Sequence, residues 1–245
     1  MRNDKEHYIF GKPVDTSVGK VRFLKYHEYI DHQEKMGLMS MNVLHIYYAY
    51  KNQFKREKDK EILESIEMVK EQSLYNLVLS NEDFFEAYVT IFEIVLSENK
   101  TDINSILKQI FQDEELFMSM RSLVLEMNMT IEEEVSPNPE IQKAIERSRR
   151  VKQKESPKQS ISDMASSIFI ATGKDYDEIS NMTVLQFYAS YFRLNQFKSY
   201  DTTSLFATVA EKVSIEAWNK HINLFERESD TIDKDKFIKQ FKGMV

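Results

Sequence analysis

The sequence predicts a mainly α-helical protein, and three observations support this fold class. Apolar residues recur at spacings of three and four along most of the chain, as a buried helix face requires. The 245 residues include only 5 Gly and 4 Pro, which argues against a turn-rich β protein. Hydrophobic residues make up 42% of the chain, enough for a sizeable core. We therefore expect a helical N-terminal unit with a small N-terminal β-hairpin, a basic connector and a smaller C-terminal helical module.

The first element is expected to be the hairpin. Residues 7–11 and 21–24 are short runs rich in aromatic and β-branched side chains. Residues 12–19 between them contain Pro, Asp and Gly, which are typical of a turn. Because an isolated hairpin is only marginally stable in water, we expect it to lie against the helices that follow.

Helices are expected over the rest of an N-terminal unit that spans residues 1–131. Apolar residues within 62–77 share one helical face and predict a single helix there. The same periodicity predicts helices over residues 26–50, 103–111 and 114–127.

A further helix of this unit has a clear start signal. Asn81 is expected to cap it, because an Asn side chain can accept a hydrogen bond from a free amide of the first turn. The helix is expected to continue to Leu96, with both Phe84 and Phe85 among its inward-facing residues.

The composition changes at Glu132, where a connector of residues 132–159 is expected. Pro137 and Pro139 stop a helix from continuing, since proline lacks the amide hydrogen and crowds the preceding turn. Few side chains after them suit a core, so the segment is either a Pro-bounded basic linker or an exposed helix. Its basic residues are Lys143, Arg147, Arg149, Arg150, Lys152, Lys154 and Lys158.

A C-terminal helical module is expected over residues 160–226. Ser160 or Ser162 is suited to cap its first helix, and Gly173 to end that helix. Thr183 and Gln186 have the spacing of a capping box, in which each side chain binds the backbone amide of the other residue.

Two more helices are expected in this module, followed by a tail. Asp201 or Thr202 is expected to start one helix, and Ser214 to start a last one that carries Trp218, the single tryptophan of the chain. Residues 227–245 form a charged tail with enough apolar side chains for one short amphipathic helix.

Charge and composition narrow the class of partners. The net charge of −7 makes general nucleic-acid binding unlikely, because the field of the protein repels phosphate. The absence of cysteine fits a reducing compartment and excludes thiolate chemistry. No apolar run reaches the roughly 20 residues of a membrane helix, and the first residues lack the apolar stretch of a signal peptide. We expect a soluble intracellular protein that does not enter membranes.

The sequence contains no convincing catalytic or metal motif. His27 and His32 flank Glu28 at a spacing of five, whereas zinc sites of the HExxH type need four to place both rings on one helix face. Residues 233–237 resemble the start of a calcium loop but lack its Gly and its final Glu. We assign no catalytic residue, no metal ligand and no cofactor, and we expect a protein that is not an enzyme.

The order of these segments resembles the tail assembly chaperones of long-tailed bacteriophages that infect Gram-positive hosts. The similar features are Phe10-Gly11-Lys12-Pro13 near the start, a Pro-plus-charge segment from Asn138, the phrase Met182-Thr-Val-Leu-Gln-Phe-Tyr and Trp218 near the end. The resemblance covers about 220 residues, in order, and excludes the tail after Glu226.

The resemblance implies a non-enzymatic assembly factor. Such chaperones bind the phage tape measure protein, keep its apolar helices soluble and help to recruit tail tube subunits. It therefore implies residence in the host cell cytoplasm and absence from the mature virion. A structural virion or tail-completion protein is the alternative, and self-association into a homo-oligomer is possible.

Two groups of residues are candidates for partner binding. Phe187, Tyr191 and Trp218 are aromatic residues of the C-terminal module, for which burial in the core is an equally good interpretation. The basic group is suited to an acidic partner protein or a solvated linker more than to nucleic acid, since it lacks interleaved aromatics. It consists of Arg147, Arg149 and Arg150.

Overall fold

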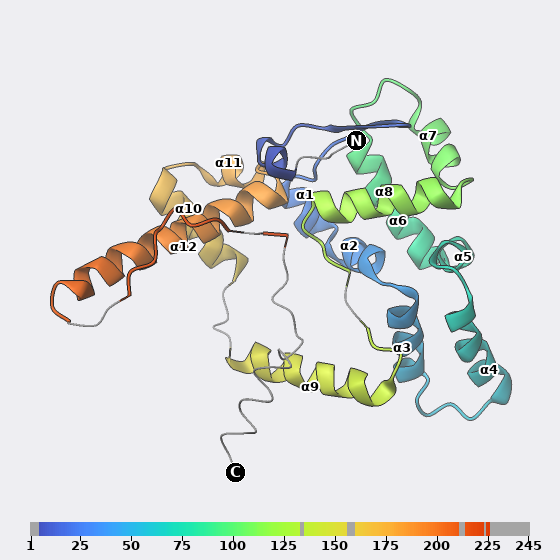
Figure 1. The fold of residues 1–245 in the computed structure, drawn as a ribbon. Coiled ribbons are helices and arrows are strands. Elements are labelled where there is room, and N and C mark those ends of the chain that lie inside the picture. Colours follow the sequence, from blue (N-terminus) through green and yellow to red (C-terminus); the bar gives the residue numbers. More distant parts are fainter. Residues whose placement is uncertain (1–4, 133–134, 156–159, 211–213, 223, 226–245) are drawn as a thin grey trace, which may run out of the picture.

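The computed structural model describes residues 5–132, 135–155, 160–210, 214–222 and 224–225, and it is mainly helical as predicted (Figure 1). The N-terminal elements are η1 (Lys5–Phe10), β1 (Val14–Thr16), β2 (Gly19–Val21), α1 (Tyr26–Asp31), α2 (Gln33–Ser40), α3 (Val43–Gln53), α4 (Lys60–Met68), η2 (Val69–Glu71), α5 (Leu74–Ser80), α6 (Glu82–Val95), α7 (Ile103–Ile110) and α8 (Glu114–Met127). The later elements are α9 (Pro139–Glu155), α10 (Ile161–Thr172), α11 (Tyr176–Ser180) and α12 (Val184–Ala207).

The hairpin exists, but β1 lies inside the segment predicted to be its turn, and β2 begins at the end of that segment and reaches Val21, the first residue of the predicted second strand. β1 and β2 pair in antiparallel register, with Val14 opposite Val21 and Thr16 opposite Gly19. Residues 5–10 instead form the 3₁₀ helix η1. The aromatic pattern that suggested strands comes from anchoring residues: Tyr8 and Phe23 are buried and meet edge to face, with ring centroids 5.3 Å apart.

Asn99 joins the hairpin to the helices. Its side-chain amide accepts from the Lys20 amide at 2.8 Å and donates to the Lys20 carbonyl at 2.7 Å, as a third strand would. Gly19 lies directly beside it with φ +134°, a conformation that side chains disfavour.

Gly19→Ala is expected to lower the free energy of unfolding by about 1–3 kcal/mol. The added Cβ would overlap the Asn99 amide oxygen and would also strain the backbone. Gly37→Ala is the matched control, because Gly37 lies within α2 and no neighbouring atom lies within 4 Å of the place that an added Cβ would occupy. It should stabilise by about 0.5–1 kcal/mol. Urea unfolding measures both, and equal effects of the two changes would contradict the explanation.

The N-terminal core is centred on α6 and α8. Tyr88 and Phe92 of α6 pack with Phe117 of α8, and all three side chains are buried. The predicted helix over residues 62–77 is divided into α4, η2 and α5, because Ser73 caps α5 by accepting from the Asn76 amide at 3.2 Å.

Phe85 is a second correction in this unit. The Asn81 cap and the helix after it are confirmed, with the Asn81 side chain accepting from the Phe84 amide. Phe85, however, is 39% exposed and packs against Phe111 at the surface. Adjacent helical residues point about 100° apart, so Phe84 and Phe85 cannot both face the same core.

A buried arginine joins three parts of the N-terminal unit. Arg121 of α8 donates from Nε to the Met39 carbonyl and to the Tyr88 hydroxyl, each at 3.0 Å, and from Nη2 to the Met41 carbonyl at 3.1 Å. Its Nη1 pairs with Glu132 at 2.6 Å, at the start of the connector. Burial raises the pKa of Tyr88 to about 12, so its hydroxyl stays protonated.

The connector was expected to be either a linker or an exposed helix, and the structure shows a helix, α9. α9 begins at Pro139, where the missing amide hydrogen costs nothing in a first turn. Tyr48 of α3 donates to the Ser136 carbonyl at 3.1 Å, and the Ser136 amide donates to the Gln142 side chain at 3.0 Å. The start of α9 is thus attached to the N-terminal unit.

The C-terminal module confirms the predicted caps. The Ser160 hydroxyl accepts from the Asp163 amide, and Gly173 ends α10 in the left-handed conformation at φ +70°. The Thr183 capping box is present in both directions, at 3.1 and 2.9 Å.

Two predicted helix boundaries in this module are wrong. α12 continues for 24 residues through Asp201 and Thr202. The Thr202 hydroxyl donates to the Lys198 carbonyl at 2.9 Å, a bond within the helix rather than a cap. Residues 214–222, which include Trp218, are not helical.

Candidate functional site

Two of the segments that carry the phage resemblance, residues 10–13 and 182–188, meet in space, although they lie far apart in the sequence. Gln186 uses its side-chain oxygen for the Thr183 amide and donates from Nε2 to the Ile9 carbonyl at 2.9 Å. Gly11 turns beside them at φ +63°, and a Cβ there would lie 3.0 Å from the Thr183 methyl carbon. We call this contact between η1, α1 and the start of α12 the joint.

An aromatic stack forms the centre of the joint. The rings of Tyr26 and Phe187 lie nearly parallel, at 11°, with centroids 3.7 Å apart. The Tyr26 amide donates to the Met182 carbonyl at 2.7 Å. Burial raises the pKa of Tyr26 and of Tyr188, so both phenols remain neutral at physiological pH. The aromatic centre of the joint is therefore a buried, uncharged contact that holds the C-terminal module against α1.

The structure places the predicted aromatic residues in different settings. Phe187 and Tyr191 are 0% and 5% exposed and belong to the core of the C-terminal module. In this conformation they offer almost no surface to a partner, and their role in binding stays a prediction. Trp218 is 43% exposed and meets Phe197 of α12 edge to face, with centroids 5.7 Å apart.

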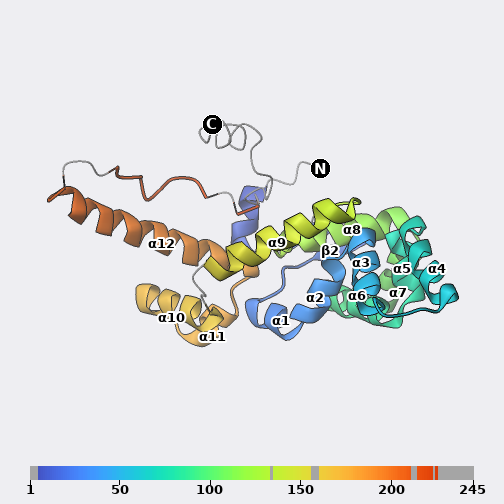
Figure 2. The same ribbon diagram turned by 90° about the horizontal axis from the view of Figure 1, so that it is seen from below.

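The second half of α12 carries exposed apolar side chains. Figures 1 and 2 show this half extending away from the N-terminal helices. Arg193 fixes the returning chain beside it by donating from Nη1 to the carbonyls of Trp218 and Lys220, each at 2.9 Å. We define the arm surface as the exposed side chains of Phe192, Phe197, Leu205 and Phe206 on α12, of Val209 just after this helix, and of Trp218 on the returning chain.

The comparisons with known proteins identify the family. Residues 3–137 match the family described as "YomV N-terminal domain", and residues 152–223 match "YomV second domain". The chain is also 32% identical over 230 residues to "SPbeta prophage-derived uncharacterized protein YomV" of Bacillus subtilis strain 168, covering 94% of this chain and 93% of the relative. The chain belongs to the YomV family. No solved structure matches it.

The YomV relationship establishes the phage origin of this sequence. The relative is a prophage-derived protein, and the match spans nearly the whole of both chains. The resemblance to phage proteins is thus confirmed at the level of origin, while the tail assembly role stays a prediction.

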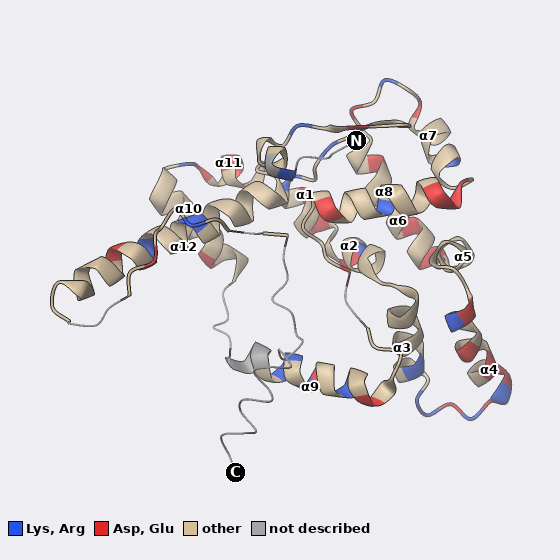
Figure 3. Ribbon diagram, in the orientation of Figure 1, with Lys and Arg blue, Asp and Glu red and all other residues tan. Residues whose placement is uncertain are grey.

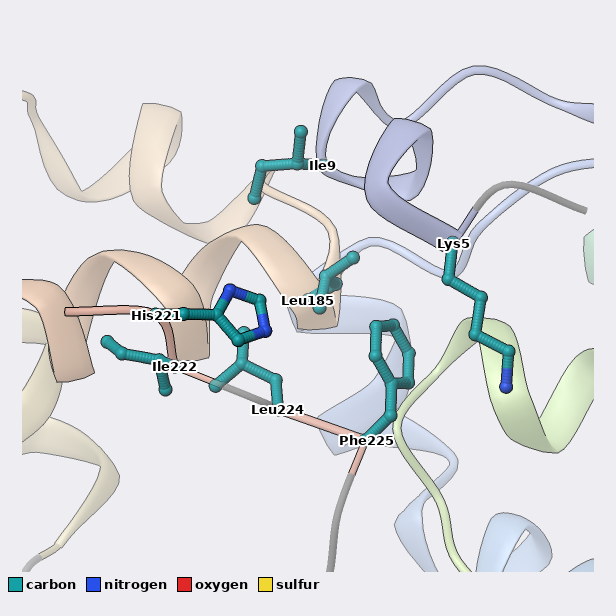
Figure 4. A pocket seen from close by; sticks show the side chains of 7 residues that line it. All are labelled: Lys5, Ile9, Leu185, His221, Ile222, Leu224 and Phe225. Atoms are coloured by element: carbon teal, nitrogen blue, oxygen red, sulfur yellow. The ribbon is translucent and has the colours of Figure 1, made fainter. Parts of the chain in front are cut away.

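A pocket of about 600 Å³ lies beside the joint in this YomV-family protein (Figure 4). Its walls come from η1, the start of α12 and the returning chain near Ile222 and Leu224. Phe225 reaches into this region, meets Tyr8 edge to face and lies 5.5 Å from the Lys5 ammonium. The lining is mostly apolar, with Lys5 and His221 as its titratable side chains, and this composition suits an apolar group more than a polar substrate.

The predicted basic residues lie on α9. Arg147 and Arg150 are exposed, whereas Arg149 is partly buried and has an interaction partner. The side chains of Lys152 and Lys154, and the whole of Lys158, lie outside the described residues. Figure 3 shows Lys and Arg recurring along this helix.

The structure also bears on metals and membranes. Among the described residues, no three His, Asp or Glu side chains come close enough to hold a metal ion. None of the helices in the described part of the chain has the length and apolar character to cross a bilayer.

Sequence reasoning about this YomV-family chain missed the joint. The local pattern marks Tyr26 as an ordinary helix residue and Gln186 only as part of a cap. The sequence does contain two distinctive local patterns at these positions: Gly11 is followed two residues later by proline, and Thr183 is followed three residues later by Gln186. Nothing in a single sequence indicates that such distant phrases touch.

Proposed function

We propose that this protein is a non-enzymatic phage tail assembly chaperone that binds the tape measure protein and helps to recruit tail tube subunits in the host cytoplasm. The arm surface carries the proposal. Large exposed apolar side chains on α12, on the residue Val209 just after it and on the returning chain at Trp218 fit an amphipathic helical client, which can pack its own apolar side chains against them. The phage origin of the family and the resemblance of its motifs support the same role.

The net charge of the chain is compatible with this role. A protein that covers apolar helices has to stay soluble itself, and a charge of −7 opposes self-precipitation. The joint supports this role because it fixes the first turn of α12 to the N-terminal unit and so holds the arm surface at a defined position.

Co-expression with the tape measure protein of the same phage tests the proposal. The wild-type chain should raise the soluble fraction of that client. Leu205→Asp/Phe206→Asp should return the client to the level without chaperone, because charged groups on an apolar contact face lose hydration without gaining partners. Quantitative gels of soluble and pellet fractions provide the measurement.

Met68→Asp is the matched control, since Met68 is 60% exposed on α4 and Phe206 is 61% exposed on α12. It should leave the client soluble. If the wild-type chain does not solubilise the client, the chaperone assignment fails. Mass spectrometry of purified virions examines the alternative, because a structural or tail-completion protein would be retained in the particle.

A further inference from the structure

α9 presents a seam of small and apolar side chains to solvent. Ile141 and Val151 are each 53% exposed, and Ala144 between them is also exposed. Their spacings of three and seven place them along one line of the helix, in the pattern of a coiled-coil seam. Ser148 continues the same line and is partly buried.

A line of positive charge runs beside this seam. Lys143, Arg147 and Arg150 are exposed and follow one another at spacings of four and three, so they share one face of α9. At 100° per residue, Arg147 lies about 60° from Ala144, between the seam and the other two cations. The outer surface of α9 is therefore apolar along its centre and basic along one edge.

The opposite side of α9 is the one attached to the molecule. Gln142 is 7% exposed and binds the Ser136 amide, and Tyr48 holds the turn before the helix. Figure 2 shows α9 crossing the molecule on the side from which that view is taken. The seam and its basic edge thus face outward on a helix whose start is fixed.

We propose that α9 is a docking surface for an acidic amphipathic helix of a partner protein. Small residues in the seam allow a second helix to approach closely, and the basic edge selects a partner with Asp or Glu beside its own seam. This surface is separate from the arm surface, and the proposal does not depend on the chaperone function.

The other possible occupants fit less well. A second copy of α9 would bring two basic edges together, which like charges oppose. An anionic membrane favours helices with Trp, Phe or Leu on the apolar face, whereas this seam contains Ile, Ala, Ser and Val. A nucleic acid would use the cations but leave the apolar seam in water.

The test measures binding of a fluorescent peptide to the full-length protein by anisotropy. The probe is a designed helix of about four heptads, with Ile and Ala in its seam and Glu on the flanking positions. We expect it to bind, and we expect no binding of the same helix with Lys in place of Glu. Val151→Asp and Arg147→Glu/Arg150→Glu should each weaken binding by about tenfold or more.

The matched control is Lys55→Glu/Arg56→Glu, because both residues are exposed in the loop after α3 and the change in net charge is the same. It should leave the affinity within about twofold. Circular dichroism melting verifies that each variant is folded. Failure of the Glu peptide to bind, equal weakening in the control, or tighter binding to phosphatidylserine vesicles or to a DNA duplex would each overturn the proposal.

Discussion

Phe187→Ala should lower the free energy of unfolding by about 3–5 kcal/mol. The ring is completely buried and stacks on Tyr26, so its removal leaves a cavity in the joint and deletes the main apolar contact between α12 and α1. Chemical denaturation monitored by circular dichroism measures the loss. Limited proteolysis should also show faster cleavage near the joint, because the C-terminal module then loses the ring that packs on α1.

Phe192→Ala is the matched control for this change. Phe192 lies on the same helix and is 41% exposed. Its truncation should cost less, about 1–2 kcal/mol, since the ring is only partly buried. If both substitutions had the same cost, the joint would not be the structural centre described above. If Phe187→Ala left stability unchanged, Phe187 would become a stronger candidate for partner binding.

Arg121→Met should cost about 3–5 kcal/mol. The substitution retains much of the apolar stem but removes the donor to the Met41 carbonyl and one of the two donors to the Met39 carbonyl, and it leaves Tyr88 without its charged neighbour. The Met39 and Met41 carbonyls lie at the end of α2, and Tyr88 lies within α6. We therefore expect the whole N-terminal unit to be less stable, seen as a lower urea midpoint.

Two comparisons separate this effect from the loss of a positive charge alone. Lys108→Met removes an exposed cation from α7 and should change stability by less than about 0.5 kcal/mol. Glu132→Gln removes the partly exposed anion and should have an effect of about 1 kcal/mol, because Arg121 keeps its bonds to the carbonyls. An effect of Glu132→Gln as large as that of Arg121→Met would show that the ion pair dominates.

Local signals in the sequence predicted much of the fold. Asn81, Ser160, Gly173 and Thr183 act at helix ends, as predicted, because capping depends on residues within one turn. The helical class followed from periodicity in the same way. These features need no knowledge of what lies on the other side of the molecule.

The error at Thr202 is local: its side chain is suited to a cap, yet its hydroxyl bonds to the Lys198 carbonyl within α12. The other errors arose where distant contacts override local preference. Trp218 was expected on a helix, but Arg193 binds the backbone carbonyl of Trp218 and holds its segment along α12. The strands of the hairpin were displaced because Asn99, far along the chain, pairs with Lys20.

The candidate site was even less accessible from sequence. The exposed phenylalanines of the arm surface, Phe192, Phe197 and Phe206, and the buried Phe187 belong to the same helix and are the same residue type. Only packing distinguishes them, because the first half of α12 lies against α10 and α1 while the second half extends beyond them. The basic side of α9 was visible as a cluster, whereas its apolar seam required the helix to be known.

The joint also fixes an order of events during synthesis. Ile9 and Gln186 are 177 positions apart, so the N-terminal half leaves the ribosome well before its partner has been translated. Until α12 arrives, the Tyr26 face of the nascent chain remains uncovered. A product terminated before residue 184 therefore carries a permanently open apolar face, which makes it a target for aggregation or degradation by host proteases.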